Sequence, residues 1–185
     1  GAWLTFTGIV RTHMTMAEME KPIIAKVNGN AIGFGASLVF SSDLIVASRE
    51  ACIAHMHLSM GEIEGVGPEY GLVPGDGGVA LMPLYMSPPK AKEWLMLGPL
   101  VNAGELAEQG LINYAVAPED LDAKVDALCE KLLRRSAFAL AWTKRVANRR
   151  DVQHLNMTLD AGAAYEMASA LQNERAKIKD HFSLE

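Results

Sequence analysis

Short apolar runs separated by turn-forming residues constrain the fold of this chain more than any other feature of its sequence. Between residues 20 and 80 these runs are β-branched and are flanked by Gly, Asn, Asp or Arg-Glu. A short apolar stretch between polar turns is typical of a buried strand, because it is too brief for most helices. The predicted strands are Ile23–Val27, Leu44–Ala47 and Ala51–Ala54, and a short helix is predicted over Gly33–Phe40.

Helical spacing replaces this pattern in the second half of the chain. Pro88 opens a helical segment, where its missing N–H costs nothing, and Gly110 closes another as a natural C-cap. The predicted helices are Pro88–Leu97, Ala103–Gln109, Pro118 to about Arg135, Ala137–Arg149 and Asn156–His181, with a helix-like segment at Ile9–Glu20 and a strand at Leu111–Val116. We therefore expect an α/β part over residues 1–117 and a helical region over residues 118–185.

The charge and the cysteine count exclude several classes of protein. The chain has 17 Lys and Arg against 22 Asp and Glu, which gives a formal net charge of −5. Such a chain is a poor candidate for binding nucleic acid or an anionic membrane. Its two cysteines form no disulfide framework, and its apolar runs are too short to span a bilayer. We expect a cytoplasmic protein.

A glycine-rich turn between the first predicted strand and the first short helix is a candidate anion site. Asn28–Gly35 contains glycines at positions 29, 33 and 35, which allow close backbone approach and positive φ. The first N–H groups of a helix lack partners and can hold a phosphate or an oxyanion. The spacing fits neither a Walker loop nor a dinucleotide fingerprint. The residues alone leave both a structural turn and an anion site open.

Five ordered segments resemble the crotonase family, the enoyl-CoA hydratase/isomerase superfamily. They are Lys21–Gly35, Ser42–Ser48, Pro74–Gly78, Ala91–Gly98 and Ala107–Asn113. The resemblance implies a crotonase-like β-β-α spiral core with a helical C-terminal region that builds homotrimers or hexamers. It also implies an acyl-CoA thioester substrate and no separate cofactor, since coenzyme A belongs to the substrate. The N-terminal part of the family core, with the first oxyanion N–H group, is absent from this sequence.

The same resemblance assigns residues to the substrate site. The second oxyanion N–H group falls on Phe34, between Gly33 and Gly35, with Ala31 beside them. A backbone donor does not depend on its side chain, so phenylalanine is compatible with this role. Near the end of the chain, Lys177 and Phe182 resemble the part of the family that contacts coenzyme A.

The two glutamates of a crotonase hydratase are missing from their usual positions. The first position holds Ser37, and the second, eight residues before Gly75, holds Gly67. One alignment rescues the second position by shifting Glu69 into it. The other treats residues 62–71 as an insertion. Without them His57 precedes Asp76 by nine residues, which is similar to the branch of the family that includes 6-oxocamphor hydrolase, a β-diketone hydrolase.

A histidine and an aspartate facing one pocket can move protons near neutral pH. The candidate catalytic residues are therefore Phe34, His57 and Asp76, with Glu69 under the first alignment. His57 and Asp76 also have ordinary structural interpretations, as a strand-end histidine and a helix cap. His55 shares a strand face with His57, but no third His or Cys follows at ligand spacing, so no metal site is predicted.

The leading hypothesis is an acyl-CoA enzyme of the enoyl-CoA hydratase/isomerase type, which stabilises a thioester enolate in an oxyanion hole. The alternatives are a β-diketone hydrolase that cleaves a carbon–carbon bond, and a non-catalytic scaffold with the crotonase fold. Ser37 and Gly67 favour the scaffold over a standard hydratase, whereas the His57 and Asp76 pair favours an enzyme.

Overall fold

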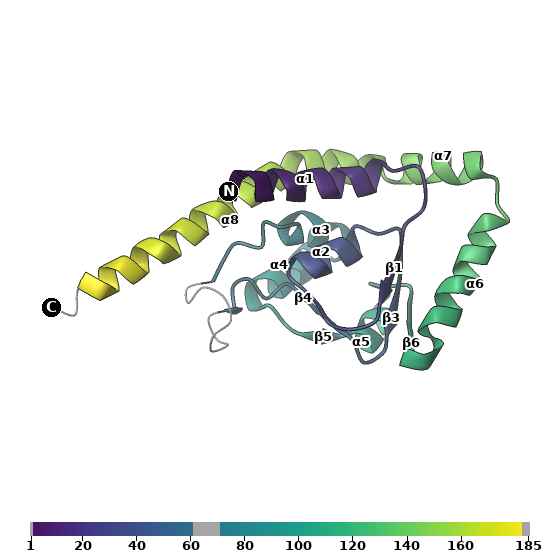
Figure 1. Ribbon diagram of the computed structural model, residues 1–185, viewed down its shortest axis with the longest axis horizontal. Coiled ribbons are helices and arrows are strands. Elements are labelled where there is room, and N and C mark those ends of the chain that lie inside the picture. Colours follow the sequence, from purple (N-terminus) through teal and green to yellow (C-terminus); the bar gives the residue numbers. More distant parts are fainter. Residues whose placement is uncertain (1, 61–70, 183–185) are drawn as a thin grey trace.

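The computed structural model describes residues 2–60 and 71–182, and it places the side chains of residues 4–60 and 71–173 (Figure 1). Within these residues, six short strands form two small sheets. The strands are β1 (Ile24–Val27), β2 (Ala31–Ile32), β3 (Leu44–Ser48), β4 (Cys52–Ala54), β5 (Val101–Asn102) and β6 (Tyr114–Val116). The helices are α1 (Ala2–Glu18), α2 (Phe34–Phe40), α3 (Gly78–Tyr85), α4 (Pro88–Leu97), α5 (Ala103–Glu108), α6 (Leu121–Leu133), α7 (Ala137–Ala147) and α8 (Arg149–Phe182), with a 3₁₀ turn, η2, at Pro118–Asp120.

The strand pairing confirms the predicted strand–strand–helix spiral. The first strands of successive units pair in one parallel sheet, in the order β1-β3-β6. The second strands pair in the other sheet, where β2 lies parallel to β4 and β5 runs antiparallel beside β4. Because parallel neighbours need a crossover, α2 lies between β2 and β3 along the chain. The parallel strands β2 and β4 thus end at the same edge of their sheet.

Each predicted helix and strand is observed, but several begin at other residues than predicted. The strand predicted at Leu111–Val116 begins only at Tyr114, because the N–H groups of Leu111 and Ile112 both donate to the carbonyl of Leu106. The predicted helix from Pro118 starts as a 3₁₀ turn before α6, and the last helix begins at Arg149 rather than Asn156. These differences lie at element boundaries, which local packing decides.

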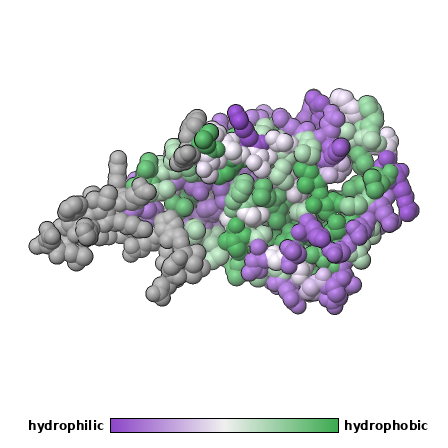
Figure 2. Space-filling view, in the orientation of Figure 1, coloured by the Kyte–Doolittle hydropathy of each residue, from purple (hydrophilic) through white to green (hydrophobic). Residues whose placement is uncertain are grey.

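α8 connects the helical half to the spiral. It packs against α1 and α3, and Figure 1 shows α1 lying alongside its first part. The buried core contains Phe40, Met82, Trp94 and residues of α8 such as Leu159. Figure 2 shows apolar side chains gathered on the surface between the strands and α6. None of the described helices is long and apolar enough to cross a membrane.

Candidate active site

The turn before α3 presents Asp76 to the interior. Gly77 is the N-cap of α3 with φ 130°, a backbone conformation that favours glycine, and no side chain caps this helix. The alternative interpretation of Asp76 as a helix cap is therefore wrong. A Cβ at Gly77 would also lie 2.6 Å from His13 Nε2, so only glycine fits between α1 and this turn.

His57 and Asp76 are in direct contact. His57 follows β4, and its Nε2 lies 3.0 Å from Asp76 Oδ2, with the two side chains 6% and 7% exposed. The Ser37 hydroxyl donates to Asp76 Oδ1 over 3.3 Å. This hydrogen bond from Ser37 orients the carboxylate of Asp76. We refer to His57 and Asp76 as the dyad.

The two members of the dyad stabilise each other's charged form. Burial alone would lower the pKa of His57, but the hydrogen bond and charge of Asp76 outweigh it and raise the pKa. Burial alone would raise the pKa of Asp76, but His57 lowers it. The stabilisation therefore weakens as the pH rises through the raised pKa of His57 or falls through the lowered pKa of Asp76.

Asp76→Asn is expected to reverse the shift of His57. Without the carboxylate, burial dominates, and the pKa of His57 should fall below its ordinary value of 6.5. The measurement is an NMR titration of the His57 ring proton in both proteins. A titration midpoint that does not move would show that Asp76 does not hold the imidazolium.

The glycine turn that contains Phe34 borders the dyad. Gly33 has φ 58°, and its N–H donates to the carbonyl of Ala54. A Cβ at Gly33 would lie 3.5 Å from His57 Cε1 and 3.6 Å from Asp76 Oδ2. Phe34 opens α2, so its N–H has no partner within the helix. The turn thus places a backbone donor next to the dyad.

Ala31 and Gly35, the other two residues predicted for this turn, differ in how closely their surroundings pack against them. Ala31 is buried in β2, opposite Ile53 of β4. A Cβ at Gly35 would meet only Ala31 Cβ, at the ordinary contact distance of 3.9 Å. The fold therefore requires glycine at position 33 but not at position 35.

His13 lies beside the site, although no sequence pattern predicts this. Its Nε2 lies 2.8 Å from the backbone carbonyl of Asp76 and its Nδ1 lies 2.7 Å from the Ser41 hydroxyl. Burial lowers the pKa of His13, more than the contact with Asp76 raises it. The neutral ring therefore donates from Nε2 and accepts at Nδ1. Its edge also meets the ring of Phe34, with centroids 5.8 Å apart.

Glu166 is a second residue that sequence analysis missed. It lies on α8, and among the described residues no group hydrogen-bonds its buried Oε2. Burial, followed by the charge of Asp76, raises the pKa of Glu166 to about 7. A Cβ at Gly75 would lie 2.0 Å from the carbonyl oxygen of Gly162 and 2.9 Å from Glu166 Cβ. The close contact of Gly75 with α8 therefore sets Glu166 against the turn of Asp76.

His55 lies next to the dyad and is completely buried. Its ring stacks on that of His57, with centroids 6.1 Å apart and planes at 25°. Burial is the main reason that the pKa of His55 falls to about 4, so this ring is neutral. Within the described residues neither of its ring nitrogens has a hydrogen-bond partner.

Three predicted site residues fall outside what the structure describes. Glu69 lies within residues 61–70. Lys177 and Phe182 lie on α8 beyond residue 173, where the side chains are not described. Their roles in the site stay predictions.

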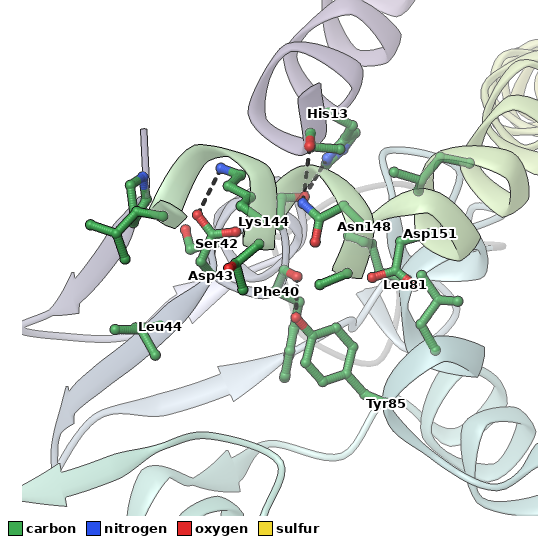
Figure 3. Close-up of a pocket in the computed structure, with 18 of the residues that line it drawn as sticks. His13, Phe40, Ser42, Asp43, Leu44, Leu81, Tyr85, Lys144, Asn148 and Asp151 are labelled. Carbon is green, nitrogen blue, oxygen red and sulfur yellow. Dashed lines mark hydrogen bonds and ion pairs between the residues drawn. The ribbon is translucent and has the colours of Figure 1, made fainter. Parts of the chain in front are cut away.

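A separate cavity of about 380 Å³ lies behind His13, as Figure 3 shows. Its lining includes neither Phe34 nor the dyad. Lys144 Nζ lies 2.7 Å from Asp43 Oδ2, and the Tyr85 hydroxyl donates to the carbonyl of Phe40 over 2.6 Å. Burial raises the pKa of Tyr85 to about 12. These polar groups of the cavity lining thus have partners within the protein, which is typical of a structural contact rather than a reaction site.

Comparisons with known proteins agree with this architecture. The chain is 32% identical over 130 residues to the crotonyl-CoA hydratase of Syntrophomonas wolfei, matching 70% of this chain and 46% of that protein. It thus spans about half the length of that relative. An enoyl-CoA hydratase/isomerase structure from Mycobacterium paratuberculosis superposes with a TM-score of 0.77 and 31% identity, over 88% of this chain and 60% of that one.

A third comparison concerns the fold alone. A β-diketone hydrolase from the cyanobacterium Anabaena superposes with a TM-score of 0.79 at 22% identity, over 89% of this chain and 62% of that one. Finally, the family model described as enoyl-CoA hydratase/isomerase matches residues 7–179. The strand–strand–helix spiral, the glycine turn and this match together show that the chain belongs to the enoyl-CoA hydratase/isomerase family.

Proposed function

We propose that the protein acts on an acyl-CoA thioester and stabilises the enolate formed from it, as an enzyme of the hydratase/isomerase type. The observation that carries this proposal is the contact between His57 and Asp76 beside the turn of Gly33 and Phe34. A donor aimed at an oxygen and a group that moves a proton at the neighbouring carbon are the two requirements of enolate chemistry.

Each residue has one role in this proposal. The N–H of Phe34 donates to the thioester oxygen as negative charge develops there, an interaction worth about 3–4 kcal/mol when one such donor is removed. His57 moves the proton at the reacting carbon, and Asp76 holds the imidazole in position and supports its charged form. Ser37 and His13 hold Asp76 through its carboxylate and its backbone carbonyl.

Hydration of short enoyl-CoA substrates is expected to be weak. Hydration needs an acid and a base around one water, and Ser37 supplies no carboxylate at the first family position. We expect a rate at least about 10²-fold below that of a two-glutamate hydratase assayed alongside. The assay follows the loss of enoyl-thioester absorbance. Equal rates would show that another carboxylate, Glu69 or Glu166, completes the site.

Glu166 is expected to shape the pH dependence of turnover. With a pKa of about 7, its carboxyl is neutral in acid and adds a negative charge beside the dyad in base. Glu166→Gln should remove a titration near pH 7 from the profile of kcat, while Glu108→Gln, at an exposed position of α5, should leave the profile unchanged. An unaltered profile in Glu166→Gln would exclude this coupling.

A substrate panel tests the proposed function as a whole. The panel contains crotonyl-CoA, a β,γ-enoyl-CoA and a bicyclic β-diketone. Conversion of a CoA thioester alone supports the proposal. Cleavage of the diketone alone supports the alternative, in which water adds to one carbonyl, the carbon–carbon bond breaks and the dyad returns a proton to the carbon. The geometry of the dyad is what favours that alternative. Reaction of none of the three would contradict the proposal.

We also propose assembly into a homotrimer or a hexamer. The supporting observation is a set of exposed apolar side chains on α7, where Phe138 is 72% exposed, Trp142 47% and Val146 63%. Apolar patches on a helical surface mark interaction sites. Light scattering should give a mass three or six times that of the chain. A clean monomer at micromolar concentration would contradict the proposal.

A further inference from the structure

We propose that His55, His57 and Asp76 form a binding site for one divalent transition-metal ion of the Zn²⁺ type. All three residues are buried, and one ligand atom from each lies within 4.8 Å of the others. The sequence places His55 and His57 on one strand face but shows no third His or Cys at ligand spacing. The fold supplies the third by bringing the turn before α3 against the end of β4.

The donor set matches the chemistry of such an ion. Two imidazoles and one carboxylate are ordinary ligands of Zn²⁺, and three protein ligands leave a fourth position open. In a tetrahedral site, metal–ligand bonds of about 2.0–2.1 Å place neighbouring ligand atoms about 3.3 Å apart. The 3.0 Å separation of His57 Nε2 and Asp76 Oδ2 is already close to that value.

His55 is the observation that points to a ligand. It is 0% exposed, and within the described part of the chain both of its ring nitrogens lack a partner. Buried polar atoms almost always have one, so a nitrogen pair left without any needs an explanation. The catalytic proposal does not use His55. A metal ion held between His55 and the dyad satisfies one of these nitrogens.

Part of the backbone around the cluster is glycine. Gly33 and Gly78 border the cluster without side chains. A Cβ at Gly33 would come within 3.8 Å of His57 Nε2, and one at Gly78 within 2.9 Å of His55 Nδ1. The Ser37 hydroxyl holds the other oxygen of Asp76, at 3.3 Å. Such outer hydrogen bonds orient metal-binding carboxylates.

Metal binding and proton transfer compete for the same atoms. An ion bound to His57 and Asp76 replaces the contact between them, so the metal-bound protein lacks the free dyad. The site is thus an inhibitory one in an enzyme that uses the dyad. Its existence does not depend on the proposed function, because binding is measured without any substrate.

The test uses the protein freed of metal with a chelator and then titrated with Co²⁺ or Zn²⁺ alone. Co²⁺ should give the intense visible absorption of a tetrahedral site at one equivalent, and Zn²⁺ should displace it. Competition with a chromophoric chelator gives the affinity. His55→Gln and Asp76→Asn should each weaken binding at least about 10-fold, a loss that changes at outer residues alone can cause. Two variants are used so that the test still stands if one of them does not fold. Circular dichroism monitors the folding of both.

His154→Gln is the matched control. His154 also has a buried ring nitrogen without a partner among the described residues, but it lies on α8 outside the cluster. The His154→Gln variant should bind Co²⁺ with the same affinity as the unchanged protein. The proposal is overturned if no tetrahedral band appears, or if folded His55→Gln and Asp76→Asn bind Co²⁺ as tightly as the unchanged protein.

Discussion

Asp76→Asn is expected to lower turnover by about 10²–10⁴-fold, the usual contribution of general acid–base assistance. Asparagine retains the size of aspartate and still accepts from the Ser37 hydroxyl, so fold and assembly should persist. His57→Gln should cost a similar factor. Because the two residues act as a unit, the double variant should be little slower than the slower single one.

Glu69→Gln separates the two alignments of the sequence. If Asp76 and His57 carry the chemistry, Glu69→Gln should retain most of the activity. Full activity in Asp76→Asn together with loss in Glu69→Gln would show that residues 62–71 contain the catalytic carboxylate rather than an insertion. The comparison needs only steady-state rates of the three proteins on one substrate.

Gly75→Ala is expected to destabilise the fold by about 3 kcal/mol or more, at the upper end of the cost of overpacking. Its Cβ would lie 2.0 Å from the carbonyl oxygen of Gly162 and 2.4 Å from the carbon of that carbonyl. Both are backbone atoms of α8, so the clash cannot be relieved by turning a side chain. Either α8 must move off the turn or the turn must open, and both separate Glu166 from Asp76.

Gly29→Ala provides the control for this substitution. A Cβ at Gly29 would meet nothing within 4 Å, and its φ is not in the left-handed region. We expect a change in unfolding free energy within about 0.5 kcal/mol, as for most surface substitutions. Urea unfolding of both variants makes the comparison. Equal stability of Gly75→Ala and Gly29→Ala would mean that α8 does not pack on Gly75 as described.

The pairing of His57 with Asp76 could be predicted because the segments around both residues resemble the family. His57 ends a strand of recognisable pattern, and Asp76 lies in a Pro-Gly-x-Gly-Gly segment. Their separation along the chain fits the family once residues 62–71 are set aside. The main strands could also be predicted from the sequence, since short β-branched runs between turns have few other ways to fold.

The rest of the site could not be predicted, because distant packing creates it. His13 meets the carbonyl of Asp76 across 63 residues, and no local pattern on α1 indicates that contact. In the sequence, Glu166 is one of several charged residues on a long helix. Its place near Asp76 depends on the close contact between Gly162 of α8 and Gly75. The sequence does not predict α3, because two glycines stand at its start and Pro83 lies within it. β2 and β5 have two residues each, too few for a periodic pattern.

The exchange of α-protons of a saturated acyl-CoA with deuterium from D₂O tests the central claim most directly. Exchange requires only that Phe34 N–H hold the thioester oxygen and that the dyad remove and return a proton. It is therefore independent of which reaction follows. We predict exchange that mass spectrometry detects above the buffer rate and that falls about 10²–10⁴-fold in Asp76→Asn. Binding of the acyl-CoA without exchange, or equal exchange in both proteins, would contradict the account.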